Sequence, residues 1–358
     1  MPAIAATPAQ IDPAWMTDAL RASGAIKEAT VTAIDAKPVG NGLVGDSFRF
    51  TLTYDAAEPG APASVVGKFA AQDPSSRASG VGHQLYLKEV SFYRELAHTV
   101  KIHTPKAFFA EIDPATHDFT LIFEDLGPAR PGDQLTGCSV EDARTAMLEA
   151  AALHGPRWDD PALKTIPYLN TTAELHPHIL AALPMVLAAY HDRFDGALEP
   201  EFMALVDRLP EVMARFNGPR EGPVTLQHGD FRLDNILFDV QGGKARMGTL
   251  DWQTVSCGHG ATDVSYFLSA GLPYDVRRAH EQDLVRIYHE ELKGFGVKDY
   301  DWDTCWRDYK ASAVHGVFMG VFSAIAVERT ERSDALFLAM TRGGCVQALD
   351  HGAFDLWA

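Results

Sequence analysis

Residues 226–238, with the sequence LQHGDFRLDNILF, combine a histidine, a carboxylate and an amide at a spacing that supports chemistry. His228 and Asp230 form an HxD pair, and Asn235 follows five residues after the aspartate. A carboxylate at the mouth of such a loop can accept the proton of an incoming hydroxyl group, which is worth about 10²–10⁴-fold in rate. An exposed acidic loop is the alternative. The spacing predicts that Asp230 is a general base.

A strand pair is predicted directly after this loop, with one run at Asn235–Asp239 and a returning run at Ala245–Trp252. If the intervening turn is centred on its two glycines, the numbers of paired residues add up to about 485, as in a tight hairpin. Asp251 then lies beside Asn235. An amide oxygen and a carboxylate at one place suit Mg²⁺, which takes one or two carboxylates plus substrate phosphates. Asn235 and Asp251 are therefore the candidate metal ligands.

A buried carboxylate is predicted in the helix-like pattern from Gly82 to Thr99. One face of this pattern carries Leu85, Glu89, Phe92 and Leu96, and the other side carries Lys88, Ser91 and Glu95. Glu89 thus lies within an apolar stripe, where an unpaired carboxylate costs several kcal/mol. Its candidate partner is Lys68, in a short apolar strand. A solvated glutamate at a kink and an outward-facing lysine are the alternative.

A glycine-rich loop, GNGLVG, occupies Gly40 to Gly45 and fits the pattern GxGxxG. A dinucleotide-binding oxidoreductase would need a helix directly after Gly45. The next residues, 46–50, are strand-like instead, so the loop is expected to join two antiparallel strands. Backbone N–H groups in such a flap can cover a triphosphate. An ordinary glycine-rich hairpin is the alternative.

The elements around these residues change in type along the chain. A loose tail is expected up to residue 11, followed by a short helix that Asp12 caps and Gly24 ends. Strands are expected at 29–39, 48–54, 64–70, 107–112 and 119–124, and long helical patterns dominate from Val140 onward. The chain is therefore predicted to be α+β. The predicted parts are a tail and helix (1–28), a mostly β N-terminal lobe (29–124), a hinge (125–128) and a helical C-terminal lobe (129–358).

Composition restricts the class of protein. The chain of 358 residues is 46% hydrophobic and 22% charged, as globular proteins are, and carries a net charge of −17. So acidic a surface argues against nucleic acid and anionic membranes as general partners. The four cysteines form no CxxC pair, which indicates reduced thiols in a cytoplasmic protein. No signal peptide is evident, and the uncharged stretch between Lys310 and Glu328 is expected to be a core helix.

Taken together, GNGLVG, Lys68, Glu89, HGDFRLDN and LDWQ resemble the small-molecule branch of the kinase fold, which includes the aminoglycoside phosphotransferase and choline kinase families. The runs EVSFYREL, LDWQ and DVSYFL are more similar still to the ecdysteroid-kinase-like members. The resemblance covers roughly residues 30 to 350. It implies a bilobal protein-kinase-like fold that transfers the γ-phosphate of ATP, with Mg²⁺, to a hydroxyl group of a small molecule.

The resemblance also implies roles for individual residues. Lys68 would hold the ATP phosphates, Glu89 would orient Lys68, Asp230 would be the catalytic base, and Asn235 and Asp251 would bind Mg²⁺. The other implied nucleotide-binding residues are Gly40, Gly42 and Gly45 in the flap, Ser47 near a phosphate, Glu124 and Leu126 in the hinge, and Val66 and Leu237 around the adenine ring. His228 would support the loop through a hydrogen bond.

Two departures from the protein-kinase motifs restrict the kind of kinase that this chain can resemble. Gly229 replaces the arginine of the protein-kinase HRD motif, and Trp252 follows Asp251, which argues against a phosphorylation-regulated protein kinase. The resemblance favours a bulky, partly apolar alcohol as acceptor, with a cationic antibiotic as the second possibility. A nucleotide-binding module without catalysis is the alternative of another class.

Three further side chains receive structural interpretations. His154 and Asp263 are expected to stabilise the helical lobe, with Asp263 capping a helix. Arg232 is expected either to meet the transferred phosphate or to pair with Asp234, and the sequence favours neither.

Overall fold

The computed structural model describes residues 2–40, 44–218 and 221–357. The chain forms two compact units. Unit 1 comprises the residues up to His98 together with Thr104–Pro128 and Gly248–Thr254, and unit 2 comprises Thr99–His103, Ala129–Met247 and the residues from Val255 onward. The segment after the predicted hairpin, which carries Asp251, therefore belongs to unit 1 although unit 2 surrounds it in sequence.

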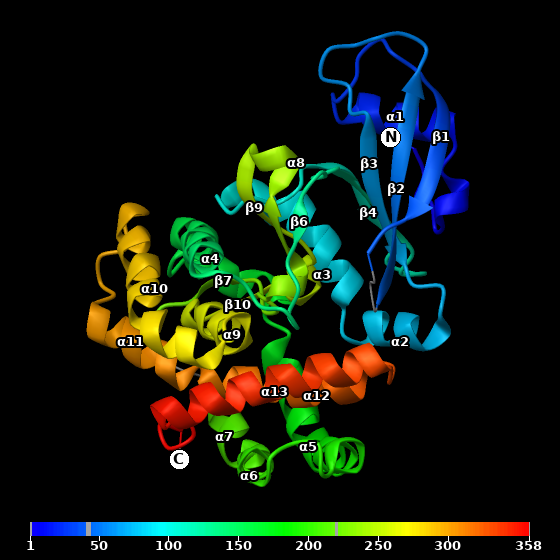
Figure 1. Cartoon of the computed structure of the whole chain (residues 1–358). Helices are drawn as coiled ribbons and strands as arrows, with labels where there is room; N and C mark the ends of the chain where they lie inside the picture. The colour runs from blue at the N-terminus through cyan, green and yellow to red at the C-terminus, as the bar shows by residue number, and fades with distance from the viewer. Residues whose placement is uncertain (1, 41–43, 219–220, 358) are drawn as a thin grey trace. The chain divides into compact units, whose positions relative to one another are not determined.

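Unit 1 contains an antiparallel five-stranded sheet with the order β1-β2-β3-β5-β4 (Figure 1). The strands are β1 (Val31–Pro38), β2 (Gly45–Tyr54), β3 (Ser64–Ala70), β4 (Ala107–Ile112) and β5 (Phe119–Glu124). The last three match their predicted bounds. β2 begins at Gly45 because Gly45 pairs with Ala70 of β3. Since a strand and not a helix follows the glycine loop, the dinucleotide-binding hypothesis is wrong.

The two faces of β3 differ in what they contact. Val65 and Phe69 are fully buried in a core that they share with Met16 and Leu20 of helix α1 (Pro13–Ala22). Because side chains alternate along a strand, Lys68 points to the opposite face of the sheet. The predicted cap of α1 is confirmed, since the Asp12 carboxylate accepts a hydrogen bond of 2.7 Å from the backbone N–H of Trp15.

The N-terminal tail is ordered against unit 1, so the expectation of a loose tail is wrong for this segment. Ala5 is buried, and its backbone N–H and C=O both bond to the Thr120 hydroxyl of β5 at 2.8 Å. The indole N–H of Trp15 donates to Ala3 O at 2.7 Å. No local sequence pattern indicates this docking, because the contacting residues are 12 and 115 positions apart in the chain.

The single helix predicted over 82–99 is broken. Helix α2 (Pro74–Gly82) precedes it, and α3 (Leu85–Ser91) continues into a π-helical turn (Phe92–Leu96) and a 3₁₀ turn (Ala97–Thr99). Between α2 and α3, Gln84 adopts a left-handed conformation with φ 57°. Lys88 and Ser91 are also buried, so the expected polar side of the helix is not exposed. Burial lowers the pKa of Lys88 to about 8.

Unit 2 is mostly helical. Its longer helices are α4 (Val140–His154), α5 (Thr172–Phe194), α6 (Pro200–Val206), α7 (Leu209–Phe216), α9 (Ala261–Gly271), α10 (Tyr274–Gly294), α11 (Trp302–Ala311), α12 (Ala313–Ala326) and α13 (Glu331–His351). Its short strands are β6 (Arg130–Pro131), β7 (Thr225–Gln227), β8 (Ile236–Asp239), β9 (Ala245–Thr249, whose end belongs to unit 1) and β10 (Ser256–Gly258).

The predicted strand pair is present as β8 and β9, next to β6 in one sheet, and β7 pairs with β10 in another. Val240 pairs with Ala245 across the turn α8 (Val240–Gly243), which is the register that a turn centred on Gly242 and Gly243 predicts. The turn is tight because Gln241 and both glycines have positive φ angles.

Helices α12 and α13 run side by side through the core of unit 2 (Figure 1). Their close approach requires glycine, since a Cβ at Gly344 would lie 2.6 Å from Val317 N and 2.7 Å from Gly316 C. Most of α12 is buried, which confirms the predicted core helix. Within the described part of the chain, no helix has the length and apolar character that a membrane span requires.

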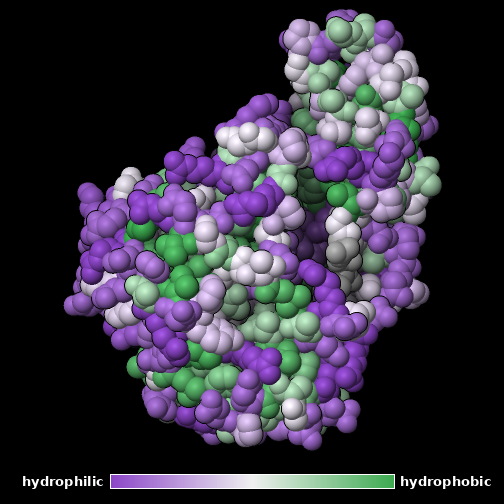
Figure 2. Space-filling model, in the orientation of Figure 1, coloured by the Kyte–Doolittle hydropathy of each residue, from purple (hydrophilic) through white to green (hydrophobic). Residues whose placement is uncertain are grey.

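The surface of unit 2 carries both hydrophobic and hydrophilic side chains. Figure 2 shows hydrophobic patches interrupted by hydrophilic side chains over its helices. Met185, Leu349 and Leu356 are the most exposed large apolar residues, and each is at least half exposed. Scattered apolar residues of this kind are ordinary on protein surfaces.

The packing of α12 on α13 leads to a prediction about stability. Gly344→Ala adds a methyl group against backbone atoms, so we expect it to lower the free energy of unfolding by about 1–3 kcal/mol. Gly294→Ala, at the end of α10, meets no atom within 4 Å and is expected to be neutral or stabilising by up to about 1 kcal/mol. Urea unfolding of both variants measures the difference, and equal stabilities would contradict the described packing.

Candidate functional site

A single buried ammonium group in unit 1 contacts two carboxylates. Lys68 Nζ lies 2.7 Å from Glu89 Oε2 and 3.0 Å from Asp251 Oδ1. The Glu89 side chain is 1% exposed and that of Asp251 is 39% exposed. The ion pair between Lys68 and Glu89 that the sequence predicts is therefore present, and Asp251 shares the same cation.

Three elements of unit 1 bring these groups together. β3 directs Lys68 away from the apolar core, α3 supplies Glu89, and the segment after β9 supplies Asp251. Trp252 fixes that segment, since its ring stacks on Phe92 at 3.8 Å between centroids and its Nε1–H donates to the Thr104 hydroxyl at 2.9 Å. Asp251 has a left-handed backbone (φ 63°), which aspartate tolerates better than most residues.

The electrostatics favour a permanently charged lysine. Burial lowers the pKa of Lys68, but the charges of Asp251 and Glu89 outweigh burial, so the pKa is raised above its usual value. Burial raises the pKa of Glu89 to about 7, and Lys68 opposes that shift. The raised pKa of Lys68 keeps its amine charged, and this charge favours the ionised form of both carboxylic acids that it contacts. With both carboxylates ionised, the cluster carries one net negative charge, and Asp251 is its solvent-facing member.

The remaining nucleotide-binding candidates of unit 1 belong to β2, β3 and β5 or to the residues next to these strands. Ser47 of β2 pairs with Lys68 across the sheet, and Gly45 begins the same strand. Val66 is on the same strand face as Lys68. Glu124 ends β5, Leu126 is buried two residues later, and Gly40 has a φ of 77° before β2. Gly42 lies outside the described residues.

The hinge region is held by Asp125. Its carboxylate accepts hydrogen bonds from Arg49 Nε and the Ser64 hydroxyl, both at 2.7 Å, and from the backbone N–H of Gly127 at 3.0 Å. These contacts tie residues 124–127 to β2 and β3 and keep the backbone of the segment in one place.

In unit 2, the Asp230 carboxylate is surrounded by donors. Arg232 Nε lies 3.1 Å from both of its oxygens, Asn235 Nδ2 lies 2.9 Å from Oδ2, and the Tyr266 hydroxyl lies 3.0 Å from Oδ1. His228 Nδ1 accepts the backbone N–H of Asp230 at 3.2 Å, as expected for a supporting histidine. Asp230 is therefore held in a fixed orientation.

Asn235 and Arg232 are both committed to this loop. Asn235 Nδ2 also donates to the backbone carbonyl of Asp230 at 2.8 Å, which leaves the side-chain oxygen as the atom that could bind a metal ion. Arg232 Nη1 donates to Asp234 at 2.6 Å, so the pair between Arg232 and Asp234, one of the two expected alternatives, is present. Arg232 also forms an ion pair with Asp230. Leu237 follows in β8 and is partly buried.

Asp263 holds the same loop from α9. Its buried carboxylate accepts the backbone N–H groups of His228 at 2.7 Å and Gly229 at 3.0 Å, and lies 3.2 Å from His154 Nε2. Burial raises the pKa of Asp263, but the hydrogen bond and charge of His154 outweigh burial and the pKa is lowered. The expectation that Asp263 caps a helix is wrong, because it is the third residue of α9 and its acceptors face the loop.

Two residues of this site were missed in the sequence. Gln134 accepts the backbone N–H of Leu233 at 3.0 Å and donates to Ala270 O at 2.7 Å, and it lies in a loop without periodicity. Tyr266 lies three residues after Asp263 on α9. Since residues at that spacing share a helix face, this signal could have placed Tyr266 beside the loop.

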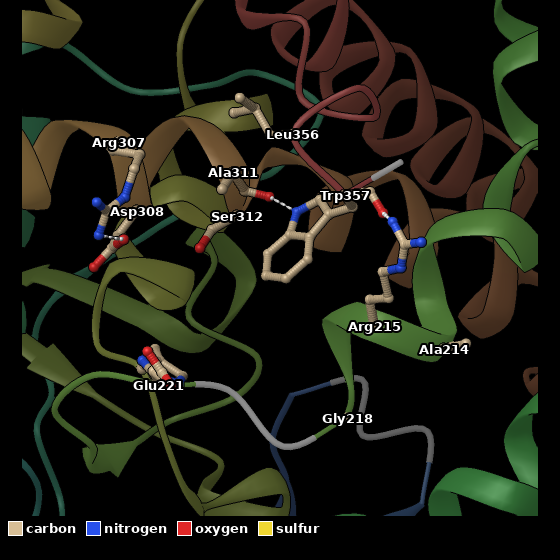
Figure 3. A pocket seen from close by; sticks show the side chains of 11 residues that line it. Ala214, Arg215, Gly218, Glu221, Arg307, Asp308, Ala311, Ser312, Leu356 and Trp357 are labelled. Carbon is tan, nitrogen blue, oxygen red and sulfur yellow. Dashed lines mark hydrogen bonds and ion pairs between the residues drawn. The ribbon is translucent and has the colours of Figure 1, made fainter.

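A pocket of about 640 Å³ in unit 2 lies elsewhere (Figure 3). Its lining includes Glu221 and His259, at the end of the β7–β10 ribbon opposite to the loop of residues 228–235. Trp357 closes one side of it, with its Nε1–H donating to Ala311 O at 2.7 Å and its carbonyl accepting from Arg215 at 2.6 Å (Figure 3). The three residues of β7 lie between this end of the ribbon and the loop that carries Asp230.

Comparison with known proteins agrees with this geometry. The model of the ecdysteroid kinase-like family matches residues 167–297, which include the loop of residues 228–235. A Plasmodium vivax ethanolamine kinase is similar in structure, with a TM-score of 0.50, 11% identity and coverage of 87% of this chain and 82% of that chain. The predicted resemblance to small-molecule kinases and the kinase-like α+β fold are therefore confirmed.

Two aminoglycoside phosphotransferases share the fold as well. A GDP complex of an aminoglycoside 2'-phosphotransferase has a TM-score of 0.53 and 13% identity, over 96% of this chain and all of that chain. A phosphotransferase in complex with gentamicin has a TM-score of 0.51 and 15% identity, over 93% of this chain and 99% of that chain. At these identities the likeness concerns the fold.

Curated relatives match only in part. Acyl-CoA dehydrogenase family member 10 of Mus musculus is 34% identical over 74 residues, and family member 11 of Gallus gallus is 28% identical over 120 residues. The matches cover 19% and 30% of this chain but 7% and 15% of those proteins. The chain thus resembles a small part of much longer relatives.

The role of Asp263 gives a prediction. Asp263→Asn replaces one acceptor oxygen by an N–H₂ group that faces one of the two backbone N–H donors, so we expect a loss of about 2–4 kcal/mol in the free energy of unfolding. Asp239→Asn removes an exposed carboxylate that pairs with Arg130 and is expected to change stability by less than about 0.5 kcal/mol. Chemical denaturation compares the two, and equal stabilities would show that Asp263 does not hold the loop.

Proposed function

We propose that this chain is a small-molecule kinase that uses ATP and Mg²⁺ to phosphorylate a hydroxyl group. The observation that carries the proposal is the pairing of one buried ammonium, Lys68, with Glu89 and Asp251, in a chain that also holds Asp230 in a donor-lined loop. A binding module alone would need no carboxylate fixed in this way beside a candidate metal ligand, Asn235.

On the nucleotide side, Lys68 is proposed to hold the α and β phosphates while Glu89 keeps its ammonium in place. Removing one partner of a buried ion pair costs about 3–5 kcal/mol, so the lysine is held firmly. The other residues proposed to contact the nucleotide are Gly40, Gly42, Gly45 and Ser47 at the phosphates, and Val66, Glu124, Leu126 and Leu237 at the adenine.

The donor set suits Mg²⁺. The cluster around Lys68 includes the partly exposed carboxylate of Asp251, and the side-chain oxygen of Asn235 is an amide oxygen that could bind a metal ion. Mg²⁺ prefers hard oxygen ligands of this kind and completes its coordination with substrate phosphates. Among the described residues, no three His, Cys, Asp or Glu side chains form a metal site of their own, so we propose that the ion arrives with the nucleotide. Bound Mg²⁺ would neutralise the charge of the phosphates.

On the acceptor side, Asp230 is proposed to take the proton of the attacking hydroxyl group. The hydroxyl oxygen forms a bond to the γ-phosphorus, the bond from that phosphorus to the β–γ bridging oxygen breaks, and ADP leaves. Positioning and charge neutralisation supply most of the acceleration in such reactions, with the base contributing a further part. Arg232, which already spans Asp230 and Asp234, is the cation of this loop.

For the acceptor, we propose a bulky, partly apolar alcohol. The match to the ecdysteroid kinase-like family model across residues 167–297, most of which belong to unit 2, supports this class. A cationic amino alcohol or aminoglycoside is the second candidate, because the net charge of −17 would attract a positively charged acceptor.

A transfer assay with radiolabelled γ-phosphate of ATP tests the proposal. The panel contains ecdysone and cholesterol as apolar alcohols, and ethanolamine, choline and gentamicin as cationic ones. We expect the wild type to label an alcohol of one class and Asp230→Asn to be about 10²–10⁴-fold slower. The matched control, Asp239→Asn, should keep the wild-type rate. Equal rates for Asp230→Asn and the wild type would contradict the assignment of the base.

A further inference from the structure

We propose that Tyr266 is a positioning residue that fixes the orientation of the Asp230 carboxylate during proton transfer. This inference rests on the proposed function and deepens it, because it assigns a role to a residue that the catalytic motifs do not contain. Tyr266 lies on α9, and its hydroxyl donates to Asp230 Oδ1 at 3.0 Å.

The proposal starts from the number of hydrogen bonds that Asp230 can accept. An ionised carboxylate has about four acceptor positions, two on each oxygen. Oδ1 receives Arg232 Nε and the Tyr266 hydroxyl, while Oδ2 receives Arg232 Nε and Asn235 Nδ2. All positions are occupied, so an incoming hydroxyl group can donate to this carboxylate only after one donor withdraws.

Arg232 is the donor that can withdraw. A single Nε–H serves both oxygens at 3.1 Å, which is a divided contact, and Arg232 retains a separate partner in Asp234 at 2.6 Å. Neither Asn235 nor Tyr266 shares one hydrogen between two oxygens of this carboxylate in that way. When the Arg232 contact opens, each carboxylate oxygen gains one free position and keeps one neutral donor.

Tyr266 is anchored well enough to serve as that fixed donor. Tyr266 is 4% exposed and belongs to the main apolar core of unit 2. The His315 ring packs edge-on against it at 5.2 Å and 82°, and its backbone carbonyl accepts the Ser269 hydroxyl at 2.7 Å. Asn235 belongs to the catalytic loop itself, whereas Tyr266 comes from a helix outside it. Tyr266 therefore sets the carboxylate plane against the body of unit 2.

The test measures Mg·ATP hydrolysis, with water as the acceptor, for the wild type and Tyr266→Phe. The control is Tyr190→Phe, since Tyr190 is equally buried in unit 2 and its hydroxyl contacts Thr341 at 2.9 Å. Each variant removes one buried hydroxyl and keeps the ring, so similar melting temperatures are expected for both. Tyr266→Phe should lower kcat about 10- to 100-fold and leave the KM for ATP within about twofold, because the lost bond involves a charged group. Tyr190→Phe should keep the wild-type rate.

A double-mutant cycle with Asp230→Asn separates positioning from general stability. If Tyr266 acts through Asp230, the change to phenylalanine should alter the residual rate of Asp230→Asn by less than about twofold. The inference is overturned if Tyr266→Phe behaves like Tyr190→Phe, or if it costs the same factor with and without Asp230. A wild type that neither hydrolyses ATP nor phosphorylates any alcohol of the panel would instead overturn the proposed function itself.

Discussion

One cation shared by two carboxylates organises the candidate site of unit 1. Lys68 leaves β3 on the face opposite the apolar core, and it can remain buried only because Glu89 and Asp251 meet it. Each carboxylate comes from a different part of the chain, one from α3 and one from the segment after β9. The lysine therefore fixes how these parts pack, and the packing places two carboxylates against one ammonium group. Carboxylate oxygens are ligands that a cation such as Mg²⁺ prefers, and the buried ammonium is the group that attracts phosphates.

Unit 2 follows a different principle, in which a loop is held by hydrogen bonds from its surroundings. Asp263 binds two backbone N–H groups of the loop, Gln134 bridges Leu233 to α9, and Tyr266 reaches the Asp230 carboxylate. None of these three side chains lies within the HGDFRLDN motif. A loop held in this way keeps its reactive groups in one geometry before a substrate arrives, which is how a fixed site lowers the reorganisation needed for reaction.

The sequence predicted what depends on local pattern. The bounds of β3, β4 and β5 and the cap at Asp12 followed from alternation and from residue preference. The pairing of Lys68 with Glu89 followed from the cost of a buried charge. The sequence failed where distant segments decide the structure. Ala5 docks on Thr120, α3 changes to a π-helical turn where Phe92 meets Trp252, and Asp263 serves the loop and caps no helix. Such contacts join residues far apart in the chain and leave no periodic trace.

Calorimetric titration with a non-hydrolysable ATP analogue, with and without Mg²⁺, tests most directly whether the Lys68 cluster is a nucleotide site. We expect the wild type to bind the analogue and Mg²⁺ to tighten binding. For Asp251→Asn we expect weaker binding and little remaining dependence on Mg²⁺, because the charge that holds the ion is gone. Absence of binding by the folded wild type, with ATP or GTP analogues alike, would contradict the account. Unchanged Mg²⁺ dependence in Asp251→Asn would show that the ion is bound elsewhere.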